Sequence, residues 1–228
     1  DGRSLLYTSF KSGVHGIYRV RPGSTAPAES LHASTSLLYT GHALRTEDAI
    51  ITNGTDLRPG SSGDIVRIAD GGRGPIEPLV ASPWIERYGI QSPDERWLSF
   101  TSTQTGREEV YVQALSGDGV PVQVSREGGT EPVWAPDASE LYYRGYIDGR
   151  FMLLGAALRH APDLAVARQR ELFSAAQMRG TGPHANYDVS PDGRTFAMVR
   201  ESNSRLIVVI QNLPELLRRL RSSEPTTP

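Results

Sequence analysis

The residues that could do catalytic or metal chemistry are scattered along the chain. Five histidines stand at positions 15, 32, 42, 160 and 184. No two of them have the His-x-x-x-His or His-Glu-x-x-His spacing that brings two imidazoles to one zinc ion, and there is no Asp-x-Asp-x-Asp calcium loop. Cysteine is absent, which excludes disulfides, thiolate ligands and cysteine nucleophiles. We therefore expect no metal ion and no cofactor.

Signatures of hydrolases and kinases are absent as well. The nucleophile elbow Gly-x-Ser-x-Gly does not occur, and the nearest string, Gly60-Ser-Ser-Gly63, has the wrong spacing and is expected to be a flexible loop. The Gly-rich loop with its Val-Ala-Ile-Lys strand, His-Arg-Asp and Asp-Phe-Gly of protein kinases are also missing. We predict no catalytic residue, and any kinase or peptidase domain is expected to lie outside this chain.

Charge and hydropathy narrow the class of partner. A net charge of -2 and a pI near 6.2 argue against a nucleic-acid binder. The longest apolar runs, such as Leu206–Ile210, are too short to span a bilayer. The sequence begins with Asp1 and not with methionine, and its first residues do not have the pattern of a signal peptide. We expect the chain to be a piece of a longer protein.

A Pro-Asp turn recurs along the chain and indicates how the other residues are positioned. It stands at Pro93-Asp94, Pro136-Asp137 and Pro191-Asp192, with a degenerate copy at Glu47-Asp48. Proline presets the first corner of a turn, aspartate bonds its own backbone two residues on, and a glycine such as Gly193 takes a left-handed conformation without strain. Two copies have Glu95 and Ala138 in place of that glycine. Those turns should hold a strained residue or use a different turn type.

Short apolar strands separated by polar loops surround each turn. A four-stranded unit of 40 to 50 residues that repeats is typical of a β-propeller, so we predict an all-β propeller of four-stranded antiparallel blades. An unrelated β-sandwich is the alternative, although sandwiches show no turn motif locked to a period. About four to five blades are visible. The repeat units are predicted near residues 1–41, 42–87, 88–131, 132–186 and 187–212.

The first strand of each blade lines the central channel of a propeller, and its side chains are the candidate ligand-binding residues. Counting five residues back from each turn proline gives His42 (by the degenerate copy), Tyr88, Glu131 and Asn186, with Asp188 two residues further and His184 at the entry. The alternative interpretation is that these residues cap blade ends or meet water, with His184 an ordinary loop histidine. Asn53-Gly-Thr55 matches a glycosylation sequon but is expected to mark a turn.

The last residues are expected to leave the propeller. Residues 213–221 should form a short helix with an apolar stripe of leucines. We expect this helix to pack on the propeller, with a membrane-surface role as the weaker alternative. Residues 222–228 are expected to be disordered.

Four segments resemble a known family. Ser92–Phe100, Val110–Leu115, Gly128–Asp137 and Tyr187–Gly193 look like the Pro-Asp repeats of TolB-like propellers, and most closely like the propeller that ends many bacterial membrane-spanning serine/threonine protein kinases. The resemblance implies that the visible blades belong to a six-bladed propeller.

The same resemblance implies a function. It suggests a non-catalytic binding or sensor module in the bacterial periplasm or elsewhere outside the cytoplasm. A protein or peptide partner is expected, or a small ligand in the central channel, with no nucleic acid and no membrane span in this chain. The alternative is the propeller domain of a hydrolase or lyase, either a peptidase-type gating domain or a polysaccharide lyase. Such lyases need a cluster of metal-binding histidines that the scattered histidines do not clearly supply.

Overall fold

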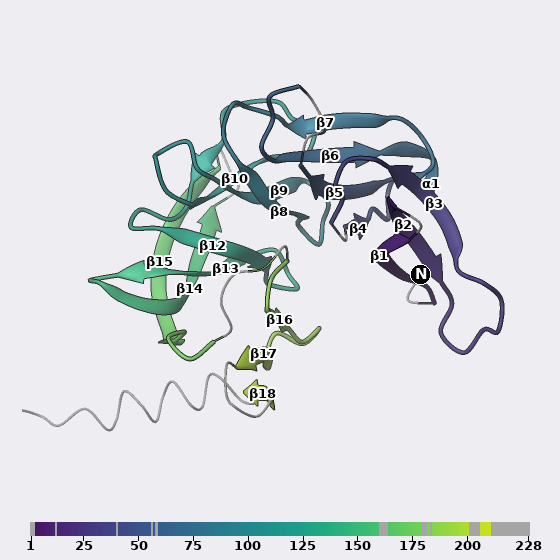
Figure 1. Cartoon of the computed structure of the whole chain (residues 1–228). Helices are drawn as coiled ribbons and strands as arrows, with labels where there is room; N and C mark the ends of the chain where they lie inside the picture. The colour runs from purple at the N-terminus through teal and green to yellow at the C-terminus, as the bar shows by residue number, and fades with distance from the viewer. Residues whose placement is uncertain are drawn as a thin grey trace, which may run out of the picture.

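The computed structural model describes residues 3–11, 13–39, 41–55, 57, 59–159, 164–178, 182, 184–200 and 206–210. They form five antiparallel sheets, which we number as blades 1 to 5 in chain order. Figure 1 shows the blades one after another around an arc, from β1–β3 past β4–β7 to β16–β18. The helix predicted at 213–221 and the tail at 222–228 lie outside the described residues.

In each blade, consecutive strands pair in chain order. Blade 1 contains β1 (Leu5–Lys11), β2 (Val14–Val20) and β3 (Glu29–Ser34). Blade 2 contains β4 (His42–Ala43), β5 (Ile50–Gly54), β6 (Asp64–Ile68) and β7 (Ile76–Val80), with the single turn α1 (Ala69–Gly72) after β6. Blade 3 contains β8 (Glu86–Gln91), β9 (Trp97–Ser102), β10 (Glu109–Ala114) and β11 (Val122–Gln123).

The last two blades continue the same order. Blade 4 contains β12 (Gly129–Trp134), β13 (Glu140–Ile147), β14 (Arg150–Arg159) and β15 (Ala165–Ser174), and blade 5 contains β16 (Tyr187–Val189), β17 (Phe196–Arg200) and β18 (Leu206–Ile210). Within the described residues, blade 1 lacks the innermost strand and blade 5 lacks the outermost one. The prediction of an all-β propeller with four-stranded antiparallel blades is confirmed.

The hydrophobic core lies between neighbouring blades. Ile51 and Ile65 of blade 2 pack against Leu98, Phe100 and Tyr111 of blade 3, and all five are buried. The other blade pairs are joined in the same way, through one buried cluster each. Because burying one such side chain is worth about 1.5–3 kcal/mol, the contacts between blades supply a large part of what holds the arc together.

The Pro-Asp turns join the first two strands of a blade, as predicted. In the last one, Ser190 N donates to Thr195 O at 2.8 Å and Arg194 N donates to Asp192 Oδ1 at 3.1 Å. The Ser190 hydroxyl also bonds this carboxylate, and the two hydrogen bonds lower the pKa of Asp192. These aspartates therefore have a structural role.

The two turns without glycine use the same left-handed conformation. The φ angle is 54° at Glu95, 60° at Ala138 and 70° at Gly193, so the first of the two expected alternatives, a strained residue, is correct. In a side chain-bearing residue this conformation costs about 1–2 kcal/mol.

Glu95 has compensating contacts with blade 2. Its carboxylate accepts hydrogen bonds from the backbone N–H groups of Arg45 and Thr46 and from the Thr46 hydroxyl. Burial acts to raise the pKa of Glu95, but the bonds from Thr46 and Arg45 outweigh it, so the pKa is lowered. The strained residue therefore fastens the turn of blade 3 to the turn of blade 2.

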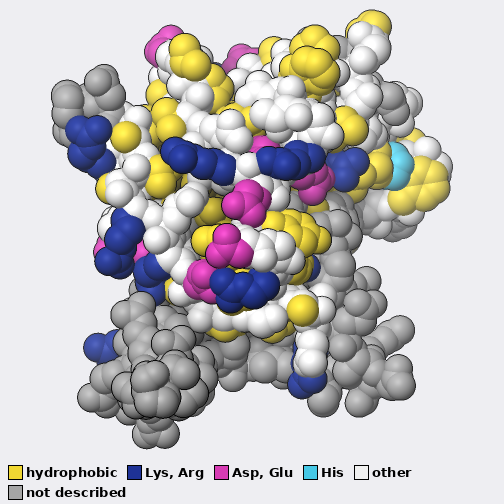
Figure 2. All heavy atoms as spheres, turned by 90° about the vertical axis from the view of Figure 1, so that its left-hand side faces the viewer, with side chains coloured by type: hydrophobic (Ala, Val, Ile, Leu, Met, Phe, Trp, Pro, Cys, Tyr) yellow, Lys and Arg dark blue, Asp and Glu magenta, His cyan; other side chains and the backbone are white. Residues whose placement is uncertain are grey.

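The outer surface of blade 4 carries mixed charges. Figure 2 shows the side of the molecule on which β13–β15 lie, with basic and acidic side chains next to one another. Arg150 pairs with Glu171 at 2.8 Å and Arg170 pairs with Glu140 at 2.7 Å. Among the described residues of this face, basic and acidic side chains are therefore interspersed. Among the described residues, no helix has the length and apolar character to cross a membrane.

Candidate functional site

A cavity of about 230 Å³ lies among the first strands of four blades. We call it the central cavity. Its walls come from β4 and β5 of blade 2, β8 of blade 3, β12 of blade 4, and β16 with the preceding residues of blade 5. The residues that line it are His42, Asn53, Tyr88, Gly89, Ile90, Pro132, Val133, His184, Ala185, Tyr187 and Asp188. Four of the six predicted channel residues are among them: His42, Tyr88, His184 and Asp188.

Tyr88 reaches the cavity from a β-bulge. Arg87 pairs with Thr101 and Ile90 with Ser99, so β8 has one residue more than β9 at this point. Tyr88 takes up the extra length with a φ of 56°, a conformation uncommon outside glycine, which is often found near functional sites. Its hydroxyl donates to the carbonyl of Gly182. Burial, with help from Glu131 and Glu108, raises the pKa of Tyr88 to about 12, so the phenol is neutral at pH 7.

Glu131 occupies the equivalent bulge in β12 with a φ of 55°, but its side chain does not line the cavity. The carboxylate is completely buried and lies 3.0 Å from Nη1 of Arg144, which is 2% exposed. It also accepts from Asn186, through the backbone N at 3.0 Å and Nδ2 at 3.2 Å. Tyr187 donates its hydroxyl to the Glu131 carbonyl at 2.8 Å. Glu131 and Asn186, predicted from sequence as channel-lining ligand residues, instead tie blade 4 to blade 5.

His42 lies two residues nearer the turn than predicted. It pairs with Ile51, in the second pair from the turn, and Asp188 pairs with Ala197 in the same position of blade 5. The turn of blade 2 is closed by Leu44 N donating to Ala49 O at 2.9 Å, as Ser190 N donating to Thr195 O closes the last turn. Arg45 and Thr46, and not Glu47 and Asp48, therefore stand where the other turns have Pro-Asp. His42 is therefore the counterpart of Asp188 and not of Tyr88.

The two counterparts influence each other across the cavity. Burial among the neighbouring blades lowers the pKa of His42, and the negative charge of Asp188 opposes this effect. The net effect is a His42 pKa below its usual value, although the residue keeps an exposed surface. Asp188 is exposed, and its Oδ1 accepts from Val189 N at 2.8 Å.

Asn53 is a cavity residue that the sequence interpretation missed. It lies inside β5 and is 5% exposed, so the prediction of a turn at Asn53-Gly-Thr55 is wrong. Its burial also leaves it a poor glycosylation acceptor. Asn53 lines the cavity, and its carboxamide is open to it. A polar amide at the end of the run Ile50-Ile-Thr52 was the available signal.

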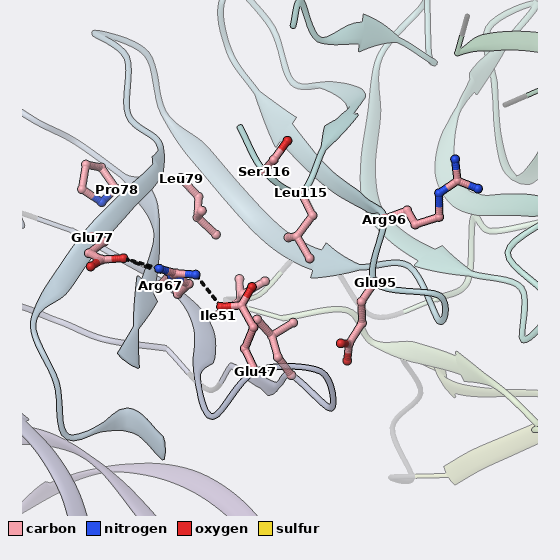
Figure 3. Close-up of a pocket in the computed structure, with 11 residues that line it drawn as sticks. Glu47, Ile51, Arg67, Glu77, Pro78, Leu79, Glu95, Arg96, Leu115 and Ser116 are labelled. Atoms are coloured by element: carbon pink, nitrogen blue, oxygen red, sulfur yellow. Dashed lines mark hydrogen bonds and ion pairs between the residues drawn. The ribbon is translucent and has the colours of Figure 1, made fainter. Parts of the chain in front are cut away.

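A larger hollow between blades 2 and 3 is less suited to a ligand. It encloses about 570 Å³ over Leu44, Ile51, Leu79 and Leu115. As Figure 3 shows, Arg67 extends between Glu77 and Glu47, with which it forms ion pairs. Since Glu95 is also bound by Arg45 and Thr46, the charged groups here are largely satisfied by one another. Among the described residues, no group of three or more His, Asp or Glu could hold a metal ion.

No protein-family model matches the chain, and no curated protein matches it. Solved structures do. TolB from Acinetobacter baumannii matches 92% of this chain with a TM-score of 0.69 at 13% identity, over 50% of its own length. A Mycobacterium tuberculosis puromycin-hydrolyzing peptidase matches 94% with a TM-score of 0.65 at 19% identity, over 36% of its length. An oligogalacturonate lyase in complex with manganese matches 90% with a TM-score of 0.60 at 12% identity, over 56% of its length.

These matches concern architecture. The chain spans half the length of the Acinetobacter TolB, and two of the three similar proteins are enzymes by name, so the shared fold does not decide the activity. Nearly the whole chain nevertheless superposes on each of them. The chain therefore has a β-propeller fold similar to that of TolB.

Proposed function

We propose that this chain is a non-catalytic binding module whose ligand site is the central cavity. One observation carries the proposal: Asn53, a polar residue that is only 5% exposed, lines this cavity, and its carboxamide is open to it. A concave, mostly apolar site with a few convergent polar groups is the usual form of a ligand pocket. A ligand in the cavity can therefore bond the Asn53 carboxamide directly.

The state of the buried carboxylate argues for binding over catalysis. A general acid or base must reach the proton that it transfers. Glu131 is enclosed by Arg144 and Asn186 and does not line the cavity. Tyr88 is held neutral by its raised pKa of about 12 and donates its hydroxyl to the Gly182 carbonyl. Among the remaining polar groups of the cavity, Asn53 can only form hydrogen bonds, whereas His42, His184 and Asp188 are able to bind a ligand or to transfer a proton.

In this proposal the module is the extracytoplasmic part of a larger bacterial signalling protein, and its partner is a protein or peptide. The likeness of the Pro-Asp repeats to those of kinase-linked sensor propellers supports this setting, as does the TolB-like fold. Any kinase domain lies outside this chain.

A propeller domain of a hydrolase or lyase is the second candidate. The peptidase and the lyase that share the fold favour it, together with two histidines and a carboxylate at the cavity wall.

Calorimetric titration of the purified chain against peptide mixtures and oligosaccharides tests the proposal, with product analysis by mass spectrometry. We expect binding without turnover. Asn53→Ala should abolish binding, whereas Gln104→Ala, which removes an exposed amide outside the cavity, should not. Turnover that disappears in His42→Ala or Asp188→Asn would establish the enzyme instead.

A further inference from the structure

We propose that the central cavity binds the amino end of a peptide, with its ammonium group at Asp188 and its first amide at Asn53. This inference rests on the proposed binding function, because it specifies the ligand of the same cavity. It is argued from three properties of the cavity walls: their charge, the chemistry of Asn53, and the size and apolar character of the space between them.

The charge of the walls favours a cation. Among the described residues that line the cavity, none is Lys or Arg, and Asp188 is the one carboxylate. Asp188 has no ion-pair partner within the described part of the chain. The nearby charge of Glu131 is balanced by Arg144. His42 adds no positive charge at pH 7, since burial lowers its pKa. The open face of the Asp188 carboxylate is therefore a site for a positively charged group.

Asn53 selects the neighbouring group of the ligand. Its carboxamide offers two N–H donors and one acceptor oxygen, from a side chain that is 5% exposed. A peptide amide presents one donor and one acceptor, and so satisfies both functions at once. An anion would use the donors alone, and a hydrocarbon would use neither.

The apolar walls of the cavity limit the size of the ligand group that it can hold. Ile90, Pro132, Val133 and Ala185 give the cavity an apolar lining, to which Gly89 contributes its backbone. The volume of about 230 Å³ is below the range of about 300–1,000 Å³ that holds a whole drug-sized ligand. The space therefore suits the end of a chain with a small apolar first residue, the rest of which extends out along the channel.

A primary ammonium beside an amide has two sources in peptides, the amino terminus and a lysine side chain. Three pentapeptides with amidated C-termini distinguish them in calorimetric titration: Ala-Val-Ala-Gly-Ser with a free amino terminus, the same peptide acetylated, and an acetylated peptide with lysine in place of the first alanine. We expect the free peptide to bind and acetylation to weaken binding at least tenfold. Equal binding of the acetylated lysine peptide would assign the cation to a side chain and overturn the inference about the terminus.

Single substitutions test whether the peptide binds in the central cavity. Asp188→Asn should weaken binding of the free peptide at least tenfold, and Asn53→Ala should do the same. Asp118→Asn, which removes an exposed carboxylate of a loop outside the cavity, should leave it unchanged, and thermal unfolding would confirm that all three variants are folded. Binding that is insensitive to acetylation or to Asp188→Asn would refute this inference.

The same experiment separates this inference from the proposed function. If an oligosaccharide binds in an Asn53-dependent manner and no peptide does, the cavity is still a ligand-binding site, but the peptide is wrong both as the ligand inferred here and as the proposed partner. If neither class binds at millimolar concentration, both are overturned.

Discussion

Nη1 of Arg144 in β13 lies 3.0 Å from Oε1 of Glu131 in β12, and both side chains are at most 2% exposed. The ion pair is completed by Asn186 of blade 5, which donates twice to the same carboxylate, and by Phe151, whose ring centroid lies 5.0 Å from the guanidinium carbon. A side chain that the strand pattern assigned to the channel is thus the centre of a contact between two blades.

Removing one member of this pair should be costly. Glu131→Gln removes the negative charge that lies 3.0 Å from the buried Arg144 guanidinium, and we expect it to lower the free energy of unfolding by about 3–5 kcal/mol, measured by urea denaturation. Glu171→Gln breaks an exposed ion pair with Arg150 and should cost at most about 1 kcal/mol. If Glu131→Gln does not fold, Glu131→Leu combined with Arg144→Met should restore folding. Equal, small losses in both single variants would contradict the structural role.

Glu95 combines backbone strain with a useful contact. Glu95→Gly relieves the left-handed strain but removes the acceptor for Arg45 and Thr46. Because each hydrogen bond to a charged group is worth about 1.5–3 kcal/mol, we expect net destabilisation in urea unfolding.

Gly193→Ala is the counterpart at the last Pro-Asp turn. It introduces strain without a steric clash, since a Cβ would meet Pro136 Cδ at 3.8 Å, and it should cost about 1–2 kcal/mol. If Glu95→Gly proved more stable than the wild type, the contact between the two turns would be unimportant.

Glu86 gives stability an unusual dependence on pH. Its carboxyl is buried, and burial raises its pKa despite hydrogen bonds from Ser82 and Ser102, with the nearby Asp64 adding to the increase. A folded-state pKa above the ordinary 4.5 means that the contribution of Glu86 to stability is fully present below that pH and is lost as pH rises through the folded pKa.

We therefore expect Glu86→Gln to gain stability relative to the wild type between pH 4.5 and 8. Urea denaturation of both proteins across this range measures the difference. A difference that did not change with pH, or that shrank as pH rose, would show that burial does not raise this pKa.

Asn53→Leu should separate stability from binding. Leucine has a similar volume, and it replaces the carboxamide at the cavity wall by an apolar side chain. We expect the free energy of unfolding, measured by thermal denaturation, to stay the same or to rise by up to about 2 kcal/mol. Ligand binding should be lost. A large loss of stability would mean that Asn53 is needed for the fold, and would weaken its assignment to a ligand.

The architecture was predictable because it depends on local chemistry that repeats. The Pro-Asp turns and the alternating strands around them determine the blade, and even the strain at Glu95 and Ala138 was among the expected alternatives. The site was less predictable. A one-residue bulge before Ile90 and before Val133 redirects neighbouring side chains, and no sequence period signals it. His42 lies two positions from its expected place for a different reason: Glu47-Asp48 is not the counterpart of the other Pro-Asp pairs.

Tyr88 and Glu131 occupy equivalent positions in two blades, but their side chains have different roles. Each lies in the bulge of its own strand with nearly the same φ. The phenol of Tyr88 lines the cavity, whereas the carboxylate of Glu131 forms the buried ion pair with Arg144. Such a difference depends on the partner that the next blade presents, and that partner is distant in the sequence. Asn53 was missed because its signal, a polar residue inside an apolar strand, is shared by many structural positions.

The central cavity takes its walls from blades 2, 3, 4 and 5, whereas the buried clusters join only neighbours along the arc. Blades 2 and 5 are not neighbours, so a ligand that contacts Asn53 and Asp188 together connects two parts of the arc that the core does not. A ligand that binds only this arrangement stabilises it by RT ln(1 + [L]/Kd), where [L] is the free ligand concentration. Occupancy of one small cavity can thus be read as a change in the stiffness of the whole arc.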